Sequence, residues 1–261
     1  ALCSWTELER LRSLNGTLSL REAGEKKRRL LDFFSEALEK SPAVSPTFRD
    51  EVRRFLEAVH RRDFFGNFRD LSRNNERIRP GVVFRCACLA PFQNEPLFDE
   101  LIDVATTFVD LRADYEIAYE PYSPQTLSKI RWVNCPMDPS RSCGRSGLPP
   151  ADVAYRFFAA ECGPQIVAVL RAIIEAPKAT LIHCAAGKDR TGCVAALLHL
   201  LSGASLEIVL ADHLASEMDT NPDTLKLFLE IVEQRGGVHA YLLDSGMTQD
   251  EIQKLTVKIS L

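Results

Sequence analysis

The amino-acid sequence predicts an α/β fold in which helices flank a central, mostly parallel sheet. Two observations lead to this prediction. Short apolar runs typical of strands alternate with helical stretches, and one apolar run, 193–201, is nearly unbroken, as expected of a buried helix. Strands are expected near 68, 82–84, 108–111, 130–133 and 180–183. Helical stretches are expected to begin at Leu97, Ala151, Arg190, Leu206, Thr224 and Asp250.

The first part of the chain is expected to form a helical extension, residues 1–62, before a main domain of residues 63–261. Apolar residues at helical spacing make one stripe within 30–38 and another within 48–59, and a segment with two prolines separates them. The favoured interpretation is a helical hairpin. The basic run 26–29 beside two phenylalanines leaves open an alternative, in which this segment contacts an anionic membrane surface.

Composition narrows the class of protein. A net charge of -4 and a pI near 5.8 argue against a general nucleic-acid binder, which needs a basic surface. No apolar run approaches the roughly 20 residues of a membrane span, so stable membrane insertion is not expected and peripheral contact stays open. Eight cysteines at scattered spacing favour a reducing compartment. The expected location is therefore the cytoplasm, with secretion into another compartment as the alternative.

The most informative stretch is the ten residues His183–Gly192, which join a strand expected at 179–182 to the apolar helix. Gly203 is placed to end that helix with a C-cap. In a strand-loop-helix arrangement of this kind, successive backbone N–H groups can turn inward to bind an anion, and the helix dipole adds positive potential. The sequence therefore predicts a phosphate-binding loop, formed by Ala185, Ala186, Gly187, Lys188, Asp189 and Arg190.

The side chains of this loop predict a reaction as well as binding. Cys184 opens the loop, where the surrounding donors favour a thiolate nucleophile. Arg190 closes it, and its planar fork can bind two phosphoryl oxygens. Thr191 is expected to stabilise the thiolate when it leaves, and His183 to orient the loop. Gly187 relieves crowding in the turn.

The motif resembles that of the cysteine-dependent protein-tyrosine phosphatases, and its Gly-Lys-Asp-Arg-Thr form is similar to the atypical bacterial tyrosine and dual-specificity phosphatases. Further matching segments are 67–71 (Asn-Phe-Arg-Asp-Leu), 79–85, 110–112 with Glu116, 211–216, and 237–242 with Gly246. The resemblance covers roughly residues 63–261. It implies a protein-tyrosine-phosphatase-like fold. Cys86 and Cys88 depart from the pattern, because relatives commonly carry small or hydroxyl residues there.

A phosphatase also needs a group that protonates the leaving oxygen and later activates water. Two carboxylates are candidates. Asp189 lies in the loop beside Arg190, with a structural role in pinning the loop as its alternative. Asp138 follows a strand and a proline-marked turn, where dual-specificity phosphatases often carry a mobile acid loop, and its alternative is an ordinary helix cap or turn residue. We favour Asp189.

The sequence thus predicts a cysteine-dependent phosphatase that acts on phosphotyrosine, with phosphoserine and phosphothreonine as further substrates, through a phosphocysteine intermediate. The reaction needs no metal and no organic cofactor. Two alternatives remain open. The Asp-Arg pair also occurs in families that act on phosphoinositides, so the resemblance implies a lipid or inositol phosphate substrate as one alternative. The other is a pseudophosphatase that binds phosphate without turnover. The expected partners are a phosphorylated protein or a phosphoinositide, and the sequence leaves the oligomeric state open.

Overall fold

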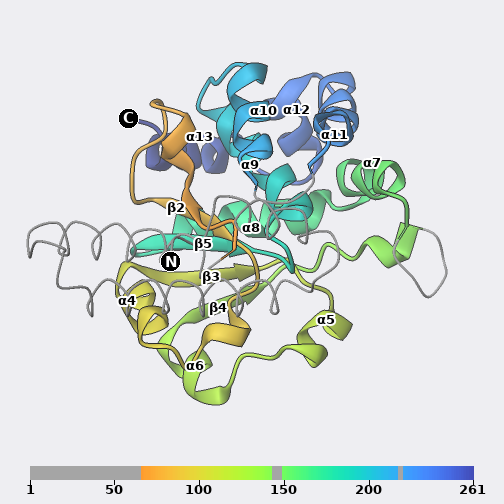
Figure 1. The fold of residues 1–261 in the computed structure, drawn as a ribbon. Coiled ribbons are helices and arrows are strands. Elements are labelled where there is room, and N and C mark those ends of the chain that lie inside the picture. The colour runs from red at the N-terminus through yellow and green to blue at the C-terminus, as the bar shows by residue number, and fades with distance from the viewer. Residues whose placement is uncertain (1–65, 143–148, 217–219) are drawn as a thin grey trace, which may run out of the picture. The chain divides into compact units, whose positions relative to one another are not determined.

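The computed structural model describes residues 66–142, 149–216 and 220–261. A five-stranded sheet runs through the described part in the order β1-β2-β5-β3-β4 (Figure 1). Its strands are β1 (Arg69–Asp70), β2 (Val83–Cys86), β3 (Ala105–Asp110), β4 (Arg131–Asn134) and β5 (Ala179–His183). Only β1 is antiparallel to its neighbour, and the other strands pair in parallel. The predicted α/β fold with a mostly parallel sheet is therefore confirmed.

Helices cover the sheet on both sides. The α-helices are α4 (Pro96–Val104), α5 (Asp114–Tyr119), α6 (Pro124–Lys129), α7 (Ala151–Glu161), α8 (Gly163–Glu175), α9 (Asp189–Leu201), α10 (Leu206–Leu214), α11 (Pro222–Gln234), α12 (Gly237–Asp244) and α13 (Gln249–Ile259). The described residues also form the short 3₁₀ helices η2 (Leu71–Asn74), η3 (Ala90–Phe92) and η4 (Pro139–Ser142). Helices α4 and α6 lie on one side of the sheet, while α9 to α13 lie on the other (Figure 1).

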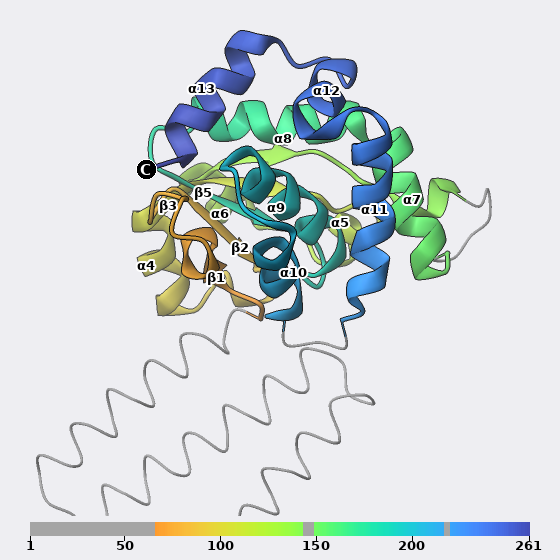
Figure 2. The same cartoon turned by 90° about the horizontal axis from the view of Figure 1, so that it is seen from above.

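Successive side chains of β3 point to opposite faces of the sheet, and each face is covered by an apolar layer. Phe108 packs edge-on against Phe98 of α4, with ring centroids 5.8 Å apart. Its neighbour Val109 belongs instead to the large core that α8 and α9 build on the opposite face. All five residues of β5 are buried. Helices α8 and α9 both lie over the sheet when the molecule is seen from above (Figure 2).

The register brings four strand ends to one edge of the sheet. His183, the last residue of β5, pairs with Cys86 of β2 on one side and with Asp110 of β3 on the other. Asp110 in turn pairs with Asn134, the last residue of β4. The turns that follow β5 and β4 therefore leave the sheet at the same level, and this edge carries both candidate acids.

Some details differ from the sequence-based expectations. Helices α5 and α6 were not predicted, because each has six residues and too little apolar periodicity to stand out. Nor was α8 predicted, which begins at Gly163 next to Pro164, after a 70° bend from α7. By contrast, Gly203 ends α9 as predicted. It has a φ of +79°, and the N–H groups of Gly203 and Ala204 bond to Leu200 and His199 in a Schellman motif.

Two further expectations concern the chain outside the core. The proposed helical extension, residues 1–62, lies outside the described residues, so it and the domain boundary stay predictions. Among the described residues, no single helix is long and apolar enough to cross a membrane. Helices α7 and α8 meet that test of length and composition only together, as a bent pair.

Candidate active site

The loop between β5 and α9 turns tightly over the end of β2. Gly187 has a φ of +67°, and a Cβ atom at this position would lie 2.3 Å from the carbonyl carbon of Cys86. Only glycine fits such a backbone and such an approach. Cys184 lies at the bottom of the loop with 2 % of its surface exposed, and the Gly187 N–H donates to its Sγ at 3.2 Å.

Groups from elsewhere in the chain hold the carbonyl oxygens of the loop outward. The carbonyl of Ala185 accepts from the backbone N–H of Cys88 at 3.0 Å, and that of Ala186 accepts from Asn67 Nδ2 at 2.7 Å. Arg85 Nη2 donates to the carbonyls of Gly187 and Lys188, at 2.8 and 3.3 Å.

Because each peptide unit is planar and trans, an outward carbonyl turns the next residue's N–H to the opposite side. Residues 186–189 therefore direct their N–H groups toward the inside of the loop. The Gly187 N–H bonded to the sulfur of Cys184 is the direct example. Together with the start of α9, these donors form a concave site for an anion next to the thiol.

A buried ionic network fixes the groups behind the loop. Asp212 of α10 accepts from Arg85 through one oxygen and from Arg69 through the other. All three side chains are at most 3 % exposed. Burial opposes ionisation of Asp212, but the charges of Arg85 and Arg69 and a hydrogen bond with His199 hold its pKa well below its ordinary value. Arg85 thus reaches the loop carbonyls from a fixed position.

Arg190 is held by a second acidic group. Its Nη1 and Nη2 donate to the two carboxylate oxygens of Glu116 on α5, at 2.6 and 2.7 Å. Nη1 also lies 3.3 Å from the carbonyl oxygen of Leu111. Burial opposes the charge of Arg190, but the hydrogen bonds to Glu116 and nearby negative charge raise its pKa above the ordinary value. The guanidinium group is therefore charged, and Glu116 and Leu111 fix its position.

His183 supports the loop from below. Its Nε2 lies 3.1 Å from the hydroxyl of Tyr122 and 3.7 Å from Asp110, and its Nδ1 lies 3.3 Å from the carbonyl oxygen of Cys184. Complete burial lowers the pKa of His183 despite the opposing charge of Asp110. A neutral ring in these contacts can orient the start of the loop.

The two candidate acids have different surroundings. Asp189, the first residue of α9, accepts a hydrogen bond from the buried hydroxyl of Tyr155 at 2.7 Å, and Lys188 Nζ lies 3.7 Å away. Asp138 instead accepts from the N–H and hydroxyl of Ser140, at 3.0 and 2.7 Å, at the start of η4. Asp138 is thus a local cap, while Asp189 is tied to another helix.

Thr191 lies beneath the loop with 1 % exposure, and its Oγ1 has no hydrogen-bond partner among the described residues. A buried hydroxyl without a partner is costly. Among the described residues, the Thr191 hydroxyl is therefore free to donate a hydrogen bond.

The sequence analysis did not assign roles to Glu116 and Tyr155. Glu116 was noted only as part of a family segment, and its distance of 74 positions from Arg190 gave no sign of the pairing. Tyr155 lies in an ordinary amphipathic helix, 34 positions from Asp189. Both contacts depend on how α5 and α7 pack at the carboxyl edge of the sheet, which local spacing does not encode.

The other described cysteines are free thiols. Burial raises the pKa of Cys86 well above its ordinary value and that of Cys88 to about 12. The described residues contain no group of three or more histidine, cysteine or acidic side chains arranged to hold a metal ion.

Comparison with known proteins gives the family. The model of the tyrosine phosphatase family matches residues 62–260. Similar solved structures are TpbA from P. aeruginosa (19 % identity, TM-score 0.40, 64 % of this chain and 88 % of that one) and a mutant form of Tk-PTP (24 %, 0.40, 61 % and 96 %). A TpbA variant in complex with phosphotyrosine is also similar (18 %, 0.37, 64 % and 88 %). No curated protein matches. Since the family match spans most of the chain and includes the whole loop, the protein belongs to the tyrosine phosphatase family.

Proposed function

We propose that the protein hydrolyses phosphotyrosine through a phosphocysteine intermediate formed on Cys184. The observation that carries this proposal is the loop itself. It places a buried thiol within 3.2 Å of an inward N–H, beside an arginine that a carboxylate holds in place. Such a site can bind a phosphate dianion and stabilise the charge that moves onto its oxygens during transfer.

In the first step, the Cys184 thiolate attacks phosphorus and a P–S bond forms. The bond between phosphorus and the tyrosine oxygen breaks, and that oxygen takes its electron pair and a proton from Asp189. Arg190 and the inward N–H groups bind the remaining phosphoryl oxygens. Arg190 can make these bonds while keeping part of its contact with Glu116, because a guanidinium group carries five donors.

In the second step, water attacks phosphorus and gives a proton to the Asp189 carboxylate. The P–S bond breaks, the thiolate of Cys184 returns, and inorganic phosphate leaves. The Thr191 hydroxyl, which has no partner among the described residues, supports this step by donating to the departing sulfur. Asp189 serves as acid and then as base, so it ends the cycle in its starting state.

Asp189 is preferred to Asp138 because of its position. It begins α9 one residue before Arg190, and the Tyr155 hydroxyl bonds to one of its oxygens and leaves the other for the substrate. One carboxylate oxygen of Asp138 accepts two hydrogen bonds from Ser140, which lies in the same turn.

The depth of the site favours an aryl phosphate. Cys184 is 2 % exposed and Arg190 8 %, so a phosphate group must reach well below the surface. A phosphotyrosine side chain is longer than phosphoserine or phosphothreonine. Tyr115 of α5, half exposed and next to Glu116, offers an aromatic surface beside the entrance. Activity on phosphoserine and phosphothreonine is expected to be weaker.

A substrate panel tests the proposal. The purified chain, Cys184→Ser and Cys193→Ala are compared on phosphotyrosine, phosphoserine and phosphothreonine peptides and on phosphoinositides. We expect the highest kcat/KM on phosphotyrosine, no turnover with Cys184→Ser, retained peptide binding by that variant, and activity with Cys193→Ala, which removes another buried thiol. Rapid acid quench should trap phosphate on Cys184. A preference for phosphoinositides, phosphate on another residue, or binding by the unaltered chain without turnover would overturn the proposal.

A further inference from the structure

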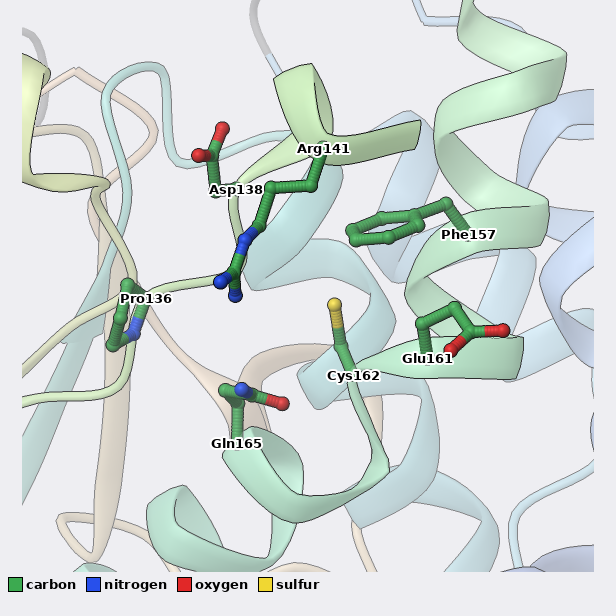
Figure 3. Close-up of a pocket in the computed structure, with 7 residues that line it drawn as sticks. All are labelled: Pro136, Asp138, Arg141, Phe157, Glu161, Cys162 and Gln165. Atoms are coloured by element: carbon green, nitrogen blue, oxygen red, sulfur yellow. The ribbon is translucent and has the colours of Figure 1, made fainter. Parts of the chain in front are cut away.

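A pocket beside the proposed active site has no role in the reaction described above. It lies between the turn after β4 and the helices α7 and α8, and it has a volume of about 220 Å³. Its lining residues are Pro136, Asp138, Arg141, Phe157, Glu161, Cys162 and Gln165 (Figure 3). Pockets for drug-sized ligands usually measure about 300 to 1,000 Å³, so this one suits a single side chain or small group.

The pocket adjoins Arg190. Met137, between the lining residues Pro136 and Asp138, donates its N–H to the carbonyl oxygen of Leu111 at 3.1 Å. The same carbonyl oxygen lies 3.3 Å from Arg190 Nη1. One carbonyl group thus separates the pocket wall from the guanidinium group of the phosphate loop. Arg141 and Arg190 both act on the pKa of the Cys162 thiol, which burial raises to about 12, as expected if the pocket lies between them.

Arg141 is the unpaired cation of this pocket. Its side chain makes no hydrogen bond or ion pair within the described residues, and its guanidinium group points into the pocket (Figure 3). The carboxylates of Asp138 and Glu161 point away from it in the same view. Asp138 is also engaged by Ser140. The ring of Phe157 lies beside the arginine and gives the pocket an apolar wall.

A second polar group in the lining also lacks a partner. The Oε1 atom of Gln165 is buried and accepts no hydrogen bond within the described residues. A ligand that suits this pocket therefore offers an anion to Arg141, a short apolar stem to Phe157 and Pro136, and an N–H to Gln165. A glutamate or aspartate residue in a peptide chain has all three.

We propose that this pocket binds an acidic side chain close to the phosphotyrosine of a peptide substrate, with Arg141 as the residue that selects it. The inference rests on the proposed phosphotyrosine activity and specifies its substrate class as acidic phosphopeptides. A carboxylate and a guanidinium group form charge-assisted hydrogen bonds with two-point geometry, which select charge and position together.

The charges of the pocket favour a peptide over a lipid headgroup. Several phosphates on an anionic membrane call for a cluster of cations. The pocket lining has one arginine and two carboxylates, and the whole chain has a net charge of -4. A single carboxylate from a peptide side chain therefore matches the single cation of the pocket lining, Arg141, better than several phosphates do.

The test compares Arg141→Gln with Arg156→Gln in the full chain. Arg156 is also exposed, lies on α7 and does not line the pocket, so its variant makes the same change in net charge. Each protein is assayed on phosphotyrosine peptides that carry glutamate or glutamine at each position near the phosphotyrosine, and on p-nitrophenyl phosphate, which has no neighbouring residue.

For at least one position, the unaltered chain should prefer glutamate to glutamine by about 5- to 10-fold in kcat/KM, mainly through KM. Arg141→Gln should abolish this preference and leave p-nitrophenyl phosphate hydrolysis unchanged, while Arg156→Gln should keep the preference. If phosphotyrosine peptides are hydrolysed without any preference, or Arg141→Gln retains it, the pocket proposal is wrong and the proposed function stands.

Failure on all phosphotyrosine peptides would overturn both proposals. A loss of activity in Arg141→Gln that is specific to phosphoinositides with a second phosphate would assign the pocket to a lipid headgroup instead and overturn the peptide assignment.

Discussion

The turns after β5 and β4 start from the same edge of the sheet, yet they are held in different ways. The turn after β5 is fixed by distant groups: Asn67 and Arg85 hold its carbonyls, and Tyr155 holds Asp189. The turn after β4 is joined to the end of β3 through the N–H groups of Cys135 and Met137, which bond to the carbonyls of Asp110 and Leu111. Beyond Met137, the side-chain bonds of Asp138 are local, to Ser140. Side chains from distant elements thus define a rigid geometry for reaction in the first turn. In the second turn the bonds of Asp138 are local, and Arg141 has no side-chain partner among the described residues.

This difference explains a division of roles. Transition-state stabilisation needs donors whose positions do not change during the reaction, because reorganisation would cost the energy that they provide. Recognition of a neighbouring side chain tolerates more freedom. We therefore place catalysis in the first turn and substrate selection in the second.

The largest expected effect comes from replacing each of the two candidate acids, in separate variants, by asparagine. Asp189→Asn should lower kcat on an alkyl phosphate by about 10² to 10⁴-fold, because that leaving group must be protonated, and should affect an activated aryl phosphate much less. Asp138→Asn is the matched control and should show no such dependence on the leaving group. Measured kcat values on the two substrates decide the matter. A selective loss in Asp138→Asn, with equal losses in Asp189→Asn, would reverse the assignment.

A second test disrupts the buried ionic network of Asp212, Arg69 and Arg85, which supports the first turn. Asp212→Asn leaves Arg69 and Arg85 buried without their carboxylate, so we expect a loss of about 3 to 5 kcal/mol in the free energy of unfolding. Urea denaturation measures it. Asp223→Asn breaks an exposed pair with Lys226 and serves as the control, with little change expected. A similar stability for both variants would show that the network does not support the loop.

The sequence was sufficient for the groups that act within one segment. The loop from Cys184 to Arg190 is contiguous, and the strand before it and helix after it have distinct apolar patterns, so its structure could be predicted as a unit. Gly203 was assigned correctly for the same reason, since a C-cap depends on a few adjacent residues.

The sequence was insufficient where a role depends on packing between elements. Glu116 meets Arg190 because a short helix follows β3, and its helical pattern is too brief to detect. Tyr155 meets Asp189 because α7 crosses the carboxyl edge of the sheet. Arg141 follows the turn that contains Asp138. Its lack of a partner among the described residues depends on where the side chains of α7 and α8 lie, which its own segment does not indicate.

Lowering the pH should decrease the free energy of unfolding, through the buried His213 of α10. Burial, with the charge of Arg85, lowers the pKa of His213 from 6.5 to about 4. Between these values the unfolded chain binds more protons than the folded one, so stability is lost as the pH falls from about 6.5 to about 4. The contribution of His213 is about 3 kcal/mol. His213→Gln should show a smaller decrease in unfolding free energy between pH 7 and pH 4.5 than the unaltered chain. An equal decrease in both proteins would exclude His213 as the titrating group.

The smallest effect should come from releasing Asp189 from α7. Tyr155→Phe removes a hydroxyl that lies 2.7 Å from Asp189 and keeps the ring that packs edge-on against His213. Loss of one such hydrogen bond is expected to reduce kcat on an alkyl phosphate by about 3- to 10-fold. The reduction should be smaller on an activated aryl phosphate, because Tyr155 acts by positioning the acid. If Tyr155 only stabilised the fold, both substrates would lose activity equally and the melting temperature would fall. If Tyr155→Phe had the same kcat on the alkyl phosphate as the unaltered chain, the bond to Tyr155 would have no part in placing Asp189. Distant groups would then fix the backbone of the first turn but not the side chain of Asp189.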